Sequence, residues 1–224
     1  MNFWAQAFEI ARVDLMVERR LGDTLRIVVP FAVVAMMVFP LALGLDLTLV
    51  SEVGIGIYWA LGILFGMQVA LRHSAADSPA RRDLHALLGV DPAARFVGRC
   101  FSGGLLSLVF FTVLMLAMVV LFSPDVPSGG WPVLALATAL VAIGLTELGT
   151  LAGEVSSGLR SRNALASLIV APLALPLVIG ASESVQALER DTGILIWILL
   201  LIASDLALAV AGVALARPLE EATR

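Results

Sequence analysis

The chain has 224 residues, of which 60% are hydrophobic, and its mean hydropathy of +0.99 lies far above that of a soluble domain. This length leaves room for about six helices of roughly 20 residues, so composition favours one integral membrane domain. All 14 basic residues are arginines; without a lysine the chain cannot form a P-loop, and we expect no ATP hydrolysis by this chain. The single cysteine, Cys100, excludes an intramolecular disulfide and a multi-cysteine metal site.

Residues 3–21 form the first predicted element, where charged and apolar residues alternate too finely for a membrane span. Four apolar residues follow helical spacing: Trp4, Phe8, Ala11 and Leu15. Most charged residues lie elsewhere around the turn: Glu9, Asp14, Glu18, Arg19 and Arg20. We expect an amphipathic helix in the membrane interface, with Trp4 at headgroup level; the alternative is a solvated segment ahead of the membrane. Charges throughout the first 26 positions argue against a cleavable signal peptide.

Six apolar segments follow, each long enough to cross a bilayer. They cover about residues 26–45, 53–71, 103–122, 131–153, 164–182 and 193–216. The segments outside the spans alternate in charge, with 13 arginines on one side and one arginine on the other. By the positive-inside rule, both termini and the long 72–99 connector are cytoplasmic. The prediction is an all-α integral membrane protein with six transmembrane helices.

The 72–99 connector is the only long polar interruption in the chain, and it contains both histidines, His73 and His85. Ser78 before Pro79 is a helix start, because serine caps and proline suits the first helical position. Three leucines at i, i+3 and i+4 share one face: Leu84, Leu87 and Leu88. The neighbouring positions are polar: Arg81, Arg82 and Asp83. Gly89 can end this helix.

We therefore predict a short cytoplasmic coupling helix at about 77–88, through which a soluble partner passes work to the membrane domain. The apolar face formed by its leucines needs a surface that buries it. That surface is either the lipid surface, the chain's own bundle, or a groove on the partner. Asp91 before Pro92 repeats the start signal and leads through Phe96 into the third span.

Two carboxylates, Glu147 and Asp205, lie inside the fourth and sixth predicted spans. A charge at the bilayer centre costs about 2.5–3.5 kcal/mol on insertion scales, so such a group is normally paired, protonated or facing water. No arginine lies in the middle of a span to pair with them. One interpretation is that they line a polar cavity or bind a partner membrane subunit. The other is a protonated carboxyl bonded to the backbone, to Thr146 or to Ser204.

The histidine inventory argues against a cofactor bound by this chain. Neither histidine lies in a span or an outer connector, which excludes a bis-histidine haem site there. Methionines in the spans are more often packing residues than ligands. In the fifth predicted span, Pro172 and Pro176 should interrupt the hydrogen-bond ladder and kink the helix.

Several motifs, taken in order, carry a family resemblance. Near the N-terminus, ARVDLMVERR fits the pattern Asp-Leu-x-x-Glu-x-Arg with Asp14, Leu15, Glu18 and Arg20. Further motifs follow along the chain: Phe39-Pro40-Leu41 with Gly44; Gly56, Ile57 and Trp59; Asp83, Leu87, Leu88, Pro92 and Arg99; Gly158, Leu159, Arg160, Pro172 and Pro176. Over about residues 3–216 the chain resembles the CcmB family, haem-exporter permeases of the cytochrome c maturation system within the type-two ABC exporter permeases.

The resemblance implies a multi-pass inner-membrane permease subunit without enzymatic activity. It implies a separate ABC ATPase, a CcmC-like haem-handling membrane subunit, a CcmE-like haem chaperone and a second copy of the chain as partners. Haem is then handled by the complex, and no nucleic acid is involved. Rival functions are an exporter of lipids, polysaccharides or drugs, and a membrane scaffold without transport. An intramembrane serine protease is disfavoured because no span contains a histidine.

Overall fold

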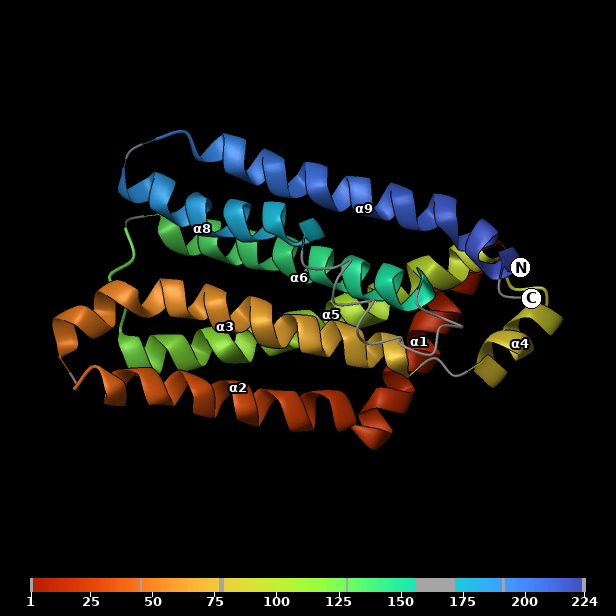
Figure 1. Cartoon of the computed structure of the whole chain (residues 1–224), viewed down its shortest axis with the longest axis horizontal. Coiled ribbons are helices and arrows are strands. Elements are labelled where there is room, and N and C mark those ends of the chain that lie inside the picture. Colours follow the sequence, from red (N-terminus) through yellow and green to blue (C-terminus); the bar gives the residue numbers. More distant parts are fainter. Residues whose placement is uncertain are drawn as a thin grey trace.

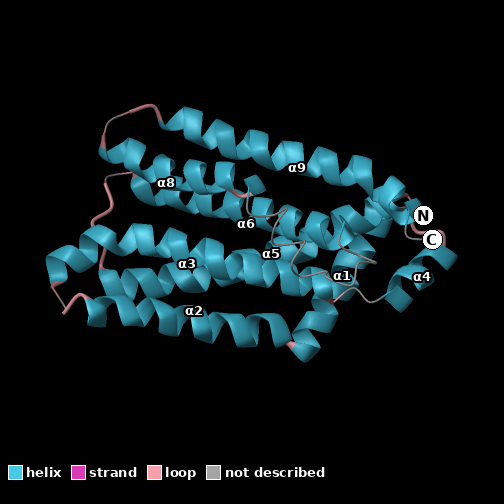
Figure 2. Ribbon diagram, viewed as in Figure 1, coloured by secondary structure: helices cyan, strands magenta, loops and turns pink. Residues whose placement is uncertain are grey.

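Figures 1 and 2 show a computed structural model of the chain, which describes residues 2–44, 46–76, 79–127, 129–155, 172–190 and 192–222. Every regular element in these ranges is a helix, so the all-α prediction is confirmed for them. The helices are α1 (Phe3–Leu21), α2 (Asp23–Ala42), α3 (Leu47–Ala75), α4 (Pro79–Leu87), α5 (Pro92–Phe122), α6 (Gly130–Val155), α8 (Leu175–Glu189) and α9 (Ile194–Ala222).

The long helices lie roughly side by side along the longest axis of the molecule (Figure 1). α1 and α4 lie at one end of this bundle, together with both termini. We call this the α4 end. The α2–α3, α5–α6 and α8–α9 connections lie at the opposite end. α3 packs against α2, α5 and α6, and α6 also contacts α5, α8 and α9, so α3, α5 and α6 form the middle of the bundle.

Among the described residues, five helices are long and apolar enough to cross a membrane: Thr24–Ala42, Thr48–Ala75, Pro92–Phe122, Gly130–Val155 and Ile194–Glu221. They correspond to five of the six predicted spans. The remaining one, 164–182, begins outside the described residues, and its last part belongs to α8. Large apolar side chains are exposed on the outer surface, as a lipid-facing surface requires: Phe31, Leu41, Leu195 and Val120, between 66% and 79%.

α5 is longer than the span predicted at 103–122, because it begins at Pro92 and continues without a break. Asp91 caps it, since its Oδ1 accepts a hydrogen bond from the Ala93 backbone N–H at 3.0 Å. Proline at the next position loses no intrahelical hydrogen bond. The additional turns place two arginines, Arg95 and Arg99, inside the packed bundle.

A sharp joint at Gly22 separates α1 from α2. Gly22 has φ +63°, a left-handed conformation that favours glycine, and its N–H closes the end of α1. Glu18 then reaches across the joint and accepts hydrogen bonds from the backbone N–H and the hydroxyl of Thr24, at 3.0 and 3.1 Å. The motif residue Glu18 therefore fixes how α1 leaves the bundle.

Phe111 of α5 fills the contact with α3. Cβ atoms added at Gly62 and Gly66 would lie 2.6 and 3.0 Å from its ring, so the two glycines give the ring its close fit. The buried Tyr58 of α3 lies beside this ring, and its hydroxyl is 2.8 Å from the Thr138 hydroxyl of α6. Aromatic packing and one satisfied polar contact thus hold the three middle helices together.

α1 packs on α5 through a face made of Ala7, Ile10, Ala11 and Asp14, all buried. The predicted apolar stripe is only partly this face, because Trp4 and Phe8 are about 60% exposed. That exposure leaves the placement of α1 in the membrane interface a prediction. Gly98 permits the close approach, since a Cβ there would lie 2.5 Å from the backbone oxygen of Ala7.

Gly98→Ala is expected to destabilise the protein by about 1–3 kcal/mol, because neither backbone can yield without separating α1 from α5. Gly104→Ala on the same helix is the matched control: its added Cβ meets nothing within 4 Å, so helix propensity makes it neutral or slightly stabilising. The measurement is the free energy of unfolding in mixed micelles. Equal stability of the two variants would contradict the close α1–α5 contact.

Candidate functional site

Buried polar side chains from four helices meet at the α4 end. The Asp14 Oδ1 of α1 lies 2.6 Å from the Arg81 Nη2 of α4, in an ion pair whose carboxylate is almost fully buried. The Ser102 hydroxyl of α5 donates to Asp14 Oδ2 at 3.4 Å, and the same hydroxyl lies 3.0 Å from His73 Nε2 of α3. We call Asp14, His73, Arg81 and Ser102 the Asp14 cluster. It connects α1, α3, α4 and α5 at one point.

Two buried arginines on α5 add further polar contacts beside the Asp14 cluster. Arg99 donates to the backbone oxygens of His73 and Ser74 at 2.9 and 3.1 Å, which closes the C-terminal end of α3. Arg95 lies 3.3 Å from both Glu154 of α6 and Glu220 of α9. Both arginines are less than 5% exposed, so these contacts take the place of water around their Nη atoms.

Asp91 connects the start of α5 to two other helices. Its backbone N–H donates to Gln6 of α1, and its Oδ2 accepts from Arg217 of α9 at 2.9 Å. The hydrogen bond from Arg217 holds the pKa of the Asp91 carboxyl below its ordinary value of 3.8. This lowered pKa contributes stability that is present above pH 3.8 and is lost as pH falls through the lowered value.

α4 presents its leucines to the outside. Leu84, Leu87 and Leu88 are 53%, 86% and 69% exposed, so the bundle does not cover the leucine face. The helix ends at Leu87, and Gly89 follows with φ +67°. Arg81, predicted as part of a coupling helix, points toward Asp14 of α1; the coupling role itself stays a prediction. The side chains of Arg82 and Asp83 lie outside the described part of the structure.

Glu147 of α6 and Asp205 of α9 are 7% and 8% exposed. Glu147 Oε2 and both carboxylate oxygens of Asp205 have no hydrogen-bond partner among the described residues. The hydroxyls considered as partners are used elsewhere: Thr146 donates to the Ala142 oxygen, and Ser204 donates to the Leu200 oxygen. These two acids are therefore buried without the compensation found at the α4 end.

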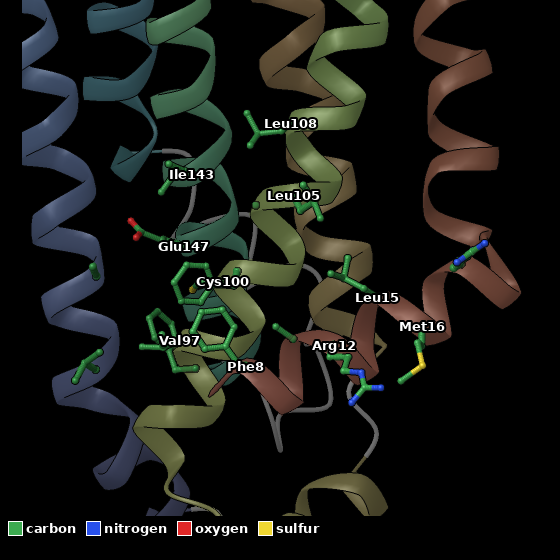
Figure 3. A pocket seen from close by; sticks show the side chains of 17 residues that line it. Phe8, Arg12, Leu15, Met16, Val97, Cys100, Leu105, Leu108, Ile143 and Glu147 are labelled. Carbon is green, nitrogen blue, oxygen red and sulfur yellow. The ribbon is translucent and has the colours of Figure 1, made fainter. Parts of the chain in front are cut away.

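A groove of about 800 Å³ leads to Glu147 between α1, α5, α6 and α9 (Figure 3). Phe8 of α1 and Val97, Cys100 and Leu105 of α5 form much of its apolar wall. Arg12 lies on the α1 side of the groove, where it pairs with Glu9 at 3.6 Å on the exposed face. The groove joins an exposed apolar surface to a buried carboxyl.

A family model described as CcmB protein matches residues 5–222. The chain belongs to the CcmB family. One relative is the heme exporter protein B of Pseudomonas aeruginosa, which is 29% identical over 208 residues that cover 89% of this chain and 90% of the relative. The resemblance inferred from ordered motifs is thereby confirmed, and the chain is a multi-pass membrane protein of a transport family.

Family membership gives the N-terminal CcmB-like motif a physical interpretation. Asp14 holds α4 through Arg81, and Glu18 holds α2 through Thr24. Arg20 lies exposed in the last turn of α1, where a positive charge suits the helix dipole. Trp4 remains exposed on the outer face. Asp14 and Glu18 thus have polar partners within the fold, and Leu15 packs against the hydrophobic core.

Of the two prolines in the predicted kink, Pro176 lies in the first turn of α8, where its missing N–H costs little. Pro172 precedes a turn at Ala174, and the residues before it lie outside the described ranges, so the kink remains a prediction.

Within the described ranges, no group of three or more histidine, cysteine or acidic residues is arranged to hold a metal ion.

Sequence reasoning did not identify His73, Arg95 or Ser102 as site residues in this CcmB-family chain. A helical signal for the α5 residues was present, because Arg95, Arg99 and Ser102 follow i, i+4, i+7 spacing and share one face. Two arginines on such a face ahead of a span indicate a buried polar layer once the helix is known to continue. Their acidic partners on α6 and α9 follow only from the tertiary fold.

Asp14→Asn is expected to weaken the attachment of α4 by about 3 kcal/mol, because Arg81 loses its buried counter-charge. The measurement is amide hydrogen exchange across residues 79–87, which should accelerate. Glu9→Gln is the control on the same helix: its pair with Arg12 is solvent-exposed and should contribute less than about 1 kcal/mol. Unchanged exchange in Asp14→Asn would refute the role of the Asp14 cluster.

Proposed function

We propose that this chain is the permease subunit of an ABC complex that exports haem, or releases a haem-loaded chaperone, during assembly of c-type cytochromes. The CcmB-family match over residues 5–222 carries the proposal, and the heme exporter from Pseudomonas aeruginosa supports the cargo. The chain is not itself an enzyme in this scheme. It has no lysine for a P-loop, so a separate ATPase subunit hydrolyses ATP.

In the proposed topology the α4 end lies in the cytoplasm, and six helices cross the inner membrane. The charge distribution supports this orientation, because 13 of the 14 arginines belong to the termini and to connectors assigned to the cytoplasmic side. α1 lies in the inner interface with Trp4 among the lipid headgroups. Residues 164–182 supply the remaining span.

The ATPase engages α4 as a coupling helix. Its exposed leucines form an apolar face suited to a groove on a partner, since the chain leaves them uncovered. Arg81 passes the motion to Asp14, whose neighbours Ser102 and His73 belong to α5 and α3. ATPase closure therefore moves α1, α3 and α5 together, with α3 and α5 acting as levers.

The remaining partners follow from the proposed pathway. A haem-handling membrane subunit and a haem chaperone act with this chain, and a second copy completes the permease. We assign no haem ligand to the chain itself. Its two histidines lie at the α4 end, where His73 is buried against Ser102.

Deleting the gene is expected to abolish all c-type cytochromes, because haem attachment needs the complex. The measurement is haem staining of membrane and periplasmic fractions, with restoration by the wild-type chain. Normal cytochrome levels in the deletion strain would rule out the proposed function.

Leu87→Arg combined with Leu88→Arg is expected to reduce co-purification of the ATPase at least about tenfold, which corresponds to about 1.4 kcal/mol. The two leucines are 86% and 69% exposed, so the change should not disturb the bundle. Val17→Arg on α1, at a side chain 41% exposed, is the control and should retain the ATPase. If the double variant co-purifies with as much ATPase as the wild-type chain does, the ATPase does not dock on α4.

A further inference from the structure

We propose that the groove between α1, α5, α6 and α9 receives a transmembrane helix of another membrane subunit, and that a basic side chain of that helix pairs with Glu147. The inference rests on the proposed function only in that the chain works in a complex with other membrane proteins. The groove leads from the outer surface to Glu147 (Figure 3). Its occupant must satisfy both an apolar wall and a buried acid.

The need for a partner comes from the two acids. Glu147 lies in α6 eight residues before Val155, and apolar side chains such as Val97 and Ile143 line the groove with it. Its Oε2 is buried without a hydrogen bond among the described residues, and so are both oxygens of Asp205. Native proteins rarely leave such groups unsatisfied, least of all in a membrane, where water does not compensate.

Asp205 strengthens the attraction for a cation at Glu147. Gly144, one turn from Glu147 on α6, packs directly against Asp205 Oδ1, and an added Cβ there would overlap that oxygen. The two acids therefore lie near the same contact between α6 and α9. A single positive charge brought to the groove would be attracted by both of them.

Two arginines of α1 also line the groove: Arg12 pairs with Glu9 at 3.6 Å, and Arg19 lies in the exposed last turn of α1. The buried Arg95 is engaged with Glu154 and Glu220, and the buried Arg99 with the last carbonyls of α3, so neither is available to Glu147. A lipid cannot supply the cation, because its charged groups lie at the membrane surface and its tails carry no donor. A basic residue in another transmembrane helix needs an acidic partner for the same reason that Glu147 needs a basic one.

The groove wall suits a helix. Phe101 and Leu105 of α5 are each 49% exposed, and Phe8 stacks on Phe101 with ring centroids 5.7 Å apart. Between them Gly104 leaves room, since an added Cβ would meet nothing within 4 Å. Small residues flanked by large apolar ones are typical of closely packed membrane helices.

The first test removes both charges. Glu147→Gln with Asp205→Asn should reduce recovery of the other membrane subunits at least about tenfold when the tagged complex is purified. The ATPase should still co-purify, because α4 is untouched, and its retention shows that the variant is folded. Ser204→Ala, beside Asp205 and bonded only to the Leu200 oxygen among the described residues, is the matched control. Full recovery of the membrane subunits with the double variant would overturn the inference, whereas loss of the ATPase from the wild-type complex would instead overturn the proposed function.

The second test identifies the occupant. A photoreactive phenylalanine at Leu105, in the groove wall, should crosslink to a different membrane subunit. The same probe at Val34, exposed on α2 and remote from the groove lining, should not. The crosslinked peptide, mapped by mass spectrometry, must belong to a transmembrane segment containing lysine or arginine. Crosslinks only to a second copy of this chain, only to lipid, or to a segment without a basic residue would each overturn the inference.

Discussion

Buried arginines must be neutralised inside the protein, and the helix arrangement at the α4 end follows from that constraint. Arg95 draws in the ends of α6 and α9 through two glutamates, and Arg99 closes α3 through its last carbonyls. Each of the four helices is held at the same level by a charge that cannot reach water. The end of the bundle nearest α4 is therefore its most tightly specified polar region.

Glu147 and Asp205, further along the bundle, differ from the buried arginines because they lack hydrogen-bond partners among the described residues. At the α4 end every buried charge described above has a partner in the same chain, whereas Glu147 and Asp205 have none among the described residues. The Nη atoms of Arg95 and Arg99 reach oxygen partners within the chain, whereas neither acid reaches a donor among the described residues. The lack of partners for Glu147 and Asp205 is therefore better explained by a contact that another protein completes than by a packing error.

Much of the fold was predictable because hydropathy and helix caps are local signals. The spans, the continuation from Asp91 into α5 and the short α4 helix all follow from residues close together in sequence. The Asp14–Arg81 contact was not predictable, although both residues had been singled out, because they are 67 positions apart and no local pattern pairs them. The Arg95 contacts with Glu154 and Glu220 were not predictable for the same reason. Hydrophobic periodicity shows which face of a helix is apolar, but it does not show which faces of two helices meet.

The seat of Phe111 between Gly62 and Gly66 limits how the middle of the bundle can move. The Phe111 ring packs against two glycines on successive turns of α3. A lengthwise shift of α3 against α5 would push the ring into the larger neighbouring side chains, so close packing opposes that movement. In the proposed function, where a partner pushes at the α4 end, this ring opposes a lengthwise shift of α3 against α5 and leaves tilting as the available movement.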